Sequence, residues 1–162
     1  MTRPLWAPWR LEYVAQADEQ PGCVFCAEAA RELPEAESLV VARGERGFVL
    51  LNKYPYSSGH LMVAPVRHLD TLGDLDDEEA LELHRLAVAS LAALEKAASP
   101  HGHNLGWNLG RVAGAGIVDH LHLHVVPRWG GDTNFMPVLA DVKVLPEHLL
   151  ATRDRLREAW PS

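Results

Sequence analysis

Short apolar runs separated by turn residues predict a hairpin and a third strand in the first half of the chain. Two strands, 40–42 and 48–51, flank the polar turn 43–47. A third strand, 60–64, follows the loop 54–59 and ends before Pro65, which cannot donate a ladder hydrogen bond.

Apolar residues at helical spacing predict one long helix over residues 77–98. Asp76 is the expected N-cap, and Glu79 completes a capping box three residues later. Shorter helices are expected over 26–32 and over 146–160.

Two more strands are predicted after the long helix, at 104–109 and at 120–126, joined through a loop of small residues at 110–116. Strands on both sides of one long helix indicate an α+β fold with a mostly antiparallel sheet, one long helix and a C-terminal helix. The 162 residues fit one domain. We divide it into an N-terminal arm (1–22), a core (23–126) and a C-terminal extension with a helix (127–162).

The composition is that of an ordinary globular domain, with 48% hydrophobic and 23% charged residues. A formal net charge of −7 argues against a general nucleic-acid surface, although a local pocket can still bind a small anion. The first residues lack an apolar core of secretory length, and no run is long enough to span a membrane. We therefore expect a cytoplasmic protein with no membrane partner.

The most informative segment is the strand that carries His120, His122 and His124. Because strand side chains alternate between faces, the three imidazoles are expected on one face, spaced by roughly 7 Å. The spacing alone fits a chance cluster on a solvent face, a packed polar edge, a metal site or phosphate chemistry. The glycine-rich loop 110–116 favours phosphate, because consecutive backbone amides can bind phosphate oxygens.

The sequence HLHLHVV at 120–126 resembles the signature of the histidine triad (HIT) superfamily. The likeness extends over nearly the whole chain, through Asn52, the pair Gly59-His60, Asn108 and the proline after the triad. The stretch from His120 to Val138, together with LWAPWR near the N-terminus, resembles the bacterial branch related to diadenosine tetraphosphate phosphorylase.

This resemblance implies a HIT-like fold and a nucleotidyl transfer. His122 would attack the α-phosphorus of a nucleotide and form a covalent nucleotidyl-histidine, which phosphate or water then releases. Neutral imidazole is a competent nucleophile near pH 7, provided that its other ring nitrogen is held; we expect a backbone carbonyl there. His124 would assist the leaving group. The other implied nucleotide-binding positions are Asn52, His60, Asn108, Gly114 and Gly116.

Two cysteines, Cys23 and Cys26, suggest a metal clip or a redox pair in a reducing compartment, while two reduced core cysteines are the alternative. The resemblance supplies His68 and His120 as further ligands, which gives the four that a structural Zn²⁺ site needs. It also implies an adenine nucleotide as substrate and a homodimer, in which Trp129 would approach the partner's site.

The sequence leaves open whether phosphate or water accepts the nucleotidyl group. Hydrolases of the family usually carry glutamine or serine four residues before the first triad histidine, where this chain has Gly116. That glycine favours phosphate as acceptor. The alternatives are a hydrolase of dinucleoside polyphosphates or adenosine phosphoramidates that uses water, a nucleotide-binding protein with little turnover, and a metal-dependent oxidoreductase that uses all three histidines.

Overall fold

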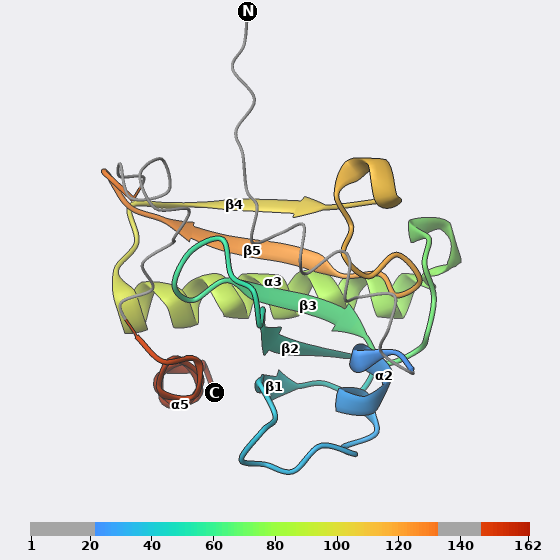
Figure 1. Cartoon of the computed structure of the whole chain (residues 1–162), viewed down its shortest axis with the longest axis horizontal. Helices are drawn as coiled ribbons and strands as arrows, with labels where there is room; N and C mark the ends of the chain where they lie inside the picture. Colours follow the sequence, from blue (N-terminus) through green and yellow to red (C-terminus); the bar gives the residue numbers. More distant parts are fainter. Residues whose placement is uncertain (1–21, 133–146) are drawn as a thin grey trace, which may run out of the picture.

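The computed structural model describes residues 22–132 and 147–162, so the expected N-terminal arm, apart from Gly22, lies outside the described residues. The strands form one antiparallel sheet in the order β1-β2-β3-β5-β4 (Figure 1). Their bounds are β1 Val40–Arg43, β2 Gly47–Leu51, β3 Leu61–Pro65, β4 Gly102–Trp107 and β5 Leu123–Arg128. The fold is α+β, as expected.

The long helix α3 spans Asp77–Ala98, in agreement with the prediction. The capping box is also confirmed, because Glu79 N–H donates to Asp76 Oδ1 at 2.7 Å and Asp76 N–H donates to Glu79 Oε2 at 3.0 Å. The helix ends at Ser99, which adopts a left-handed conformation. It crosses one face of the sheet (Figure 1).

Alternation along the strands divides the core between the two sheet faces. Val49, Val63 and Val125 pack with the buried leucines of α3 and of the C-terminal helix α5 (Leu149–Ala159). Their neighbours Phe48, Leu50, Met62 and Ala64 turn to the other face and pack against Phe25 of the short helix α2 (Val24–Ala29). Because His124 is adjacent to Val125, it belongs to the face covered by α2.

The histidine segment differs from its predicted strand. Strand β5 begins at Leu123, so only His124 lies within it, and the strand continues through Pro127 to Arg128. The proline is tolerated because β3 pairs only as far as Val125, and beyond it the registered partner belongs to β4. Before the strand, Leu121 N–H donates to Leu69 O at 2.6 Å.

Other boundaries shift by a few residues, and β3 includes Pro65, before which it was expected to end. Helix α2 ends before the predicted 32, because Arg31 takes a positive φ of 59°. Strand β4 starts and ends two residues earlier than expected, and α5 begins after His148, whose side chain accepts the N–H of Leu150. Two short 3₁₀ turns, η1 (Leu72–Asp74) and η2 (Arg111–Ala113), complete the described chain. None of the helices described is long and apolar enough to cross a membrane.

Candidate active site and metal centre

His122 is held with one ring nitrogen occupied and the other bearing a lone pair. Its Nδ1–H donates to the carbonyl oxygen of His120 at 2.7 Å, which is the type of acceptor expected from the sequence. The neutral ring therefore keeps its lone pair on Nε2. Burial lowers the pKa of His122, and the hydrogen bond to His120 only partly opposes this shift. The ring is thus neutral near pH 7, as a nucleophile must be.

Aromatic contacts fix the plane of this ring. Phe25, which is fully buried, stacks on His122 with ring centroids 4.8 Å apart and an interplanar angle of 29°. The ring of His124 meets His122 edge-on at 4.9 Å. The imidazole of His122 therefore lies between a flat apolar surface and the next histidine of the triad.

A chain of hydrogen bonds sets the tautomer of His124. Tyr56 N–H donates to His60 Nδ1 at 3.0 Å, so the proton of a neutral His60 resides on Nε2. That Nε2 lies 2.9 Å from His124 Nδ1 and donates to it. His124 consequently carries its own proton on Nε2, from which it can be given to a leaving group.

The side-chain nitrogen of Asn108 lies 3.2 Å from His124 Nε2. Because His124 Nε2 carries a proton in the tautomer that the Tyr56 contact sets, we assign the Asn108 amide with its oxygen and nitrogen exchanged, so that the oxygen accepts this proton. Asn52 lies at the other end of this series of hydrogen bonds, with its side-chain nitrogen 3.5 Å from His60 Nδ1. The structure thus brings four of the predicted positions together.

The glycine-rich loop lies just before the triad and contains a 3₁₀ turn. Gly110 and Gly114 have φ values of 81° and 86°, which side-chain-bearing residues rarely adopt. Gly114 N–H donates to Arg111 O at 2.9 Å, so this amide closes the turn. Phosphate binding by Gly114 and Gly116 stays a prediction.

Cys23, Cys26, His68 and His120 form a cluster whose ligand atoms all lie within 4.8 Å of one another. The Sγ of Cys23 is 3.3 Å from His120 Nδ1, and the Sγ of Cys26 is 3.2 Å from His68 Nδ1. Tetrahedral zinc with bonds of about 2.0–2.3 Å separates its ligands by roughly 3.3–3.8 Å. The four side chains therefore fit zinc in their chemistry, and the three cysteine–histidine contacts of 3.2, 3.3 and 3.7 Å are close to its ligand spacing.

The protonation of His120 supports this assignment. Its Nε2–H donates to Pro65 O at 3.0 Å, so the neutral ring directs an unprotonated Nδ1 at the cysteines. Burial lowers the pKa of His120, whereas burial and the neighbouring Cys23 raise the pKa of the Cys26 thiol to about 11. A bound zinc ion would instead hold Cys26 as a thiolate.

Two residues at the site escaped sequence reasoning. Phe25 lies between the two cysteines and looks like an ordinary core residue; only its place beside a metal clip could have drawn attention to it. Tyr56, four residues before His60, falls in a predicted loop, yet its backbone N–H orients that histidine and its ring stacks on the imidazole at 4.7 Å. Trp129, predicted to reach a partner, donates its indole N–H to Ala98 O within the same chain.

Comparisons with known proteins agree with the fold and the motif. The model of the HIT domain family matches residues 33–131. The chain is 42% identical to a Mycobacterium tuberculosis protein named AP-4-A phosphorylase, over 96% of this chain and 83% of that protein.

Solved structures agree as well. A hypothetical histidine triad nucleotide-binding protein from Sulfolobus tokodaii has a TM-score of 0.69 and 29% identity, covering 85% of this chain and 91% of its own. A zinc-bound histidine triad family protein from Mycobacterium smegmatis has the same TM-score and 27% identity, covering 85% and 92%. The family match covers more than half of the sequence. The chain therefore belongs to the histidine triad family.

Proposed function

We propose that this protein is a nucleotidyltransferase that cleaves dinucleoside polyphosphates at the α-phosphate and passes the nucleotidyl group to inorganic phosphate through a covalent intermediate on His122. The observation that carries the proposal is the hydrogen bond from His122 Nδ1 to His120 O, which leaves Nε2 as the nucleophilic atom. The similarity to an AP-4-A phosphorylase supports diadenosine tetraphosphate as the substrate.

In the first step, His122 Nε2 forms a bond to the α-phosphorus while the bond from that phosphorus to the bridging oxygen breaks. The leaving group is ATP, and His124 Nε2–H is positioned to stabilise or protonate its departing oxygen. The hydrogen bond to His120 O disperses the positive charge that develops on the His122 ring.

In the second step, an oxygen of inorganic phosphate attacks the same phosphorus and releases His122. The product is ADP, so one diadenosine tetraphosphate and one phosphate give ATP and ADP. In this account Asn52 and His60 lie near the nucleoside, whereas Asn108 and the amide of Gly116 hold phosphate oxygens, because the amide of Gly114 already donates to Arg111 O. Zinc would be structural, held by the four-residue cluster, and would stabilise the segment from which His120 orients the nucleophile.

The resemblance also supports a cytoplasmic homodimer acting on a small nucleotide. A second candidate is hydrolysis, in which water replaces phosphate in the second step and AMP replaces ADP. The specific observation that bears on the choice is Gly116, because a glycine leaves room for an acceptor larger than water.

Product analysis tests the proposal. Purified protein is incubated with diadenosine tetraphosphate, with and without inorganic phosphate, and the nucleotides are separated chromatographically. We expect ATP and ADP in equal amounts, formed only when phosphate is present. AMP with ATP at every phosphate concentration would replace phosphorolysis by hydrolysis, and the absence of any product would overturn the enzymatic assignment.

A further inference from the structure

Helix α2 needs tertiary contacts to hold it in place. It has only six residues, and its N-cap Cys23 makes no side-chain capping hydrogen bond. Helices of this length are marginal on their own. Its position therefore depends on groups outside the helix. The same groups consequently position Phe25, which stacks on His122.

Glu28 supplies such a contact from the buried side of α2. Its side chain is only 3% exposed, yet its carboxylate is well satisfied. Ser38 Oγ–H donates to Oε2 at 2.7 Å, Leu39 N–H donates to Oε1 at 3.1 Å, and the Arg43 guanidinium lies 4.0 Å away. Burying a carboxylate is costly unless it is paired, so these partners must be held firmly in place.

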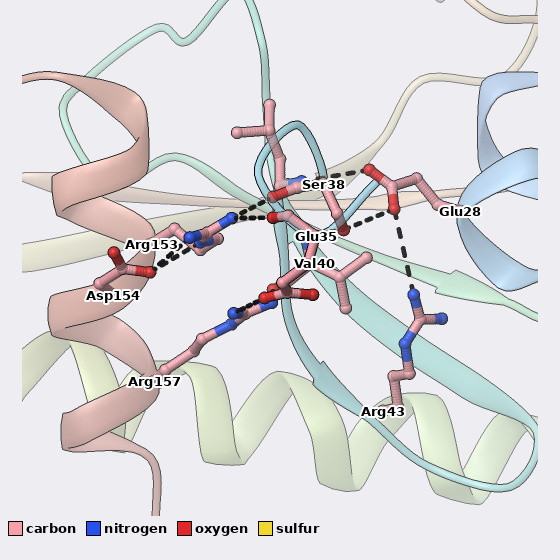
Figure 2. A network of polar contacts seen from close by, with 9 residues as sticks. Glu28, Glu35, Ser38, Val40, Arg43, Arg153, Asp154 and Arg157 are labelled. Atoms are coloured by element: carbon pink, nitrogen blue, oxygen red, sulfur yellow. Dashed lines mark hydrogen bonds and ion pairs between the residues drawn. The ribbon is translucent and has the colours of Figure 1, made fainter. Parts of the chain in front are cut away.

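Helix α5 holds those partners. Arg153, which is 7% exposed, donates from Nη1 to Glu35 O at 2.8 Å and to Ser38 O at 2.7 Å. Arg157 donates to Val40 O at 2.9 Å. Figure 2 shows these contacts as one continuous set, from two arginines of α5 through the segment 35–40 to Glu28. We call this set the Glu28 network.

The network reaches the nucleophile through Phe25. Glu28 follows Phe25 by three residues, a spacing that places two side chains on the same side of a helix. Phe25 in turn stacks on His122 at 4.8 Å and lies 5.0 Å from the ring of His120. A shift or rotation of α2 would therefore move the surface against which the nucleophile rests.

We propose that Glu28 is a positioning residue for His122, and that the Glu28 network holds α2 so that Phe25 fixes the plane of the imidazole ring. An apolar residue would bury the same side of α2 without a desolvation cost. Hydrogen bonds add direction, which hydrophobic packing does not. The catalytic part of this inference rests on the proposed role of His122, whereas the geometric part does not.

The test observes the His122 ring directly by NMR. In ¹⁵N-labelled, zinc-loaded protein, the Nδ1–H of His122 should give a protected imidazole signal, assigned by its loss in His122→Asn. We expect Glu28→Ala to shift or broaden this signal and Glu28→Gln to have a smaller effect, because glutamine keeps one acceptor oxygen. The matched control is Glu37→Gln, which makes the same chemical change at an exposed position of the segment 35–40 that Glu28 contacts.

Kinetics provide the second readout. With diadenosine tetraphosphate and phosphate, kcat of Glu28→Ala should fall by about tenfold, while KM changes by less than about twofold, because misplacing a reacting atom slows chemistry without removing substrate contacts. Combined with Phe25→Leu, which removes the flat ring, Glu28→Ala should cost little more than either change alone. If Glu28 were merely structural, Glu28→Ala would lower stability or zinc content. It would not lower kcat while leaving KM unchanged, and its effect would simply add to that of Phe25→Leu.

The outcomes separate the two proposals. If the wild-type protein forms no product, the proposed function fails, and the imidazole signal alone decides the positioning role. If the signal and kcat of both Glu28 variants match those of Glu37→Gln, the positioning role is overturned while the function stands. Should Glu28→Ala fail to fold, the comparison of Glu28→Gln with Glu37→Gln decides in the same way.

Discussion

His120 contacts His122 through its backbone carbonyl and the candidate zinc ligand Cys23 through its side chain. Its carbonyl oxygen accepts the Nδ1–H of His122 at 2.7 Å, whereas its own Nδ1 lies 3.3 Å from Cys23 Sγ. The proposed function thus divides the triad: the first histidine would be structural and orienting, and the second would attack the nucleotide. The metal-dependent oxidoreductase would need all three rings on one ion, but the unprotonated Nδ1 of His120 faces Cys23, whereas the unprotonated Nδ1 of His124 accepts from His60.

Zinc removal should therefore slow chemistry as well as destabilise the fold. We expect Cys26→Ser to lose most of its bound zinc, to lower the thermal midpoint, and to reduce kcat by about tenfold or more, because groups that orient a functional histidine carry effects of that size. Metal content by atomic spectroscopy, together with melting and rate measurements, checks this. His84→Asn, at an exposed position of α3, is the control. Full activity in zinc-free protein would contradict the coupling.

The proton on His124 Nε2 predicts a dependence on the leaving group. His124→Asn should slow cleavage of diadenosine tetraphosphate by roughly 10²-fold or more, the usual contribution of a general acid. Cleavage of a p-nitrophenyl ester of AMP by His124→Asn should be slowed much less, because its leaving group needs no proton. His60→Ala should show the same pattern in weaker form, since it removes the bond that sets the His124 tautomer. Equal losses on both substrates would argue against proton donation.

Acid stability should depend on Glu79. Arg67 donates two hydrogen bonds to this carboxylate, at 2.9 and 2.7 Å, and lowers the pKa of Glu79 from its ordinary value of 4.5 to about 2. Because the folded-state pKa is depressed, the unfolded chain binds the proton more readily. The contribution is present above about pH 4.5 and is lost as pH falls toward 2.

The matched pair for this prediction is Glu79→Gln and Glu78→Gln. Glutamine at 79 keeps a capping-box acceptor but removes the charge. Urea unfolding at several pH values should give a shallower loss of unfolding free energy between pH 4.5 and 2 for Glu79→Gln than for wild type. Glu78→Gln, whose side chain is 72% exposed, should follow wild type. Parallel curves for all three proteins would show that the ion pair with Arg67 is not the cause.

Local rules were sufficient for the long helix and for the hairpin before it, but not for the end of β3, which includes Pro65. Asp76 and Glu79 marked the start of α3, and apolar runs marked the hairpin, because these signals act within a few residues. The ends of the histidine strand were missed because they depend on long-range pairing. Pro127 looked like a stop signal, yet it lies opposite His103 at a position that β3 does not reach.

The site was predictable in its residues but not in its geometry. The cysteine spacing and the family resemblance pointed to Cys23, Cys26, His68 and His120 as zinc ligands, and the structure brings these four side chains together. Sequence could not show that His122 donates to a backbone carbonyl, or that the amide of Tyr56 sets the tautomers of His60 and His124. Those relations arise from segments distant in sequence or from backbone atoms, which carry no residue-type signal.

A covalent bond between His122 and the nucleotide is the step on which the proposed function depends most. The direct measurement is rapid mixing of the enzyme with diadenosine tetraphosphate in the absence of phosphate, followed by alkaline quenching and mass analysis of the peptides. We predict one adenylyl group on the peptide containing His122, its disappearance when phosphate is added, and no adduct in His122→Asn. Turnover by the wild-type protein without any adduct on that peptide, or turnover by His122→Asn, would contradict the account.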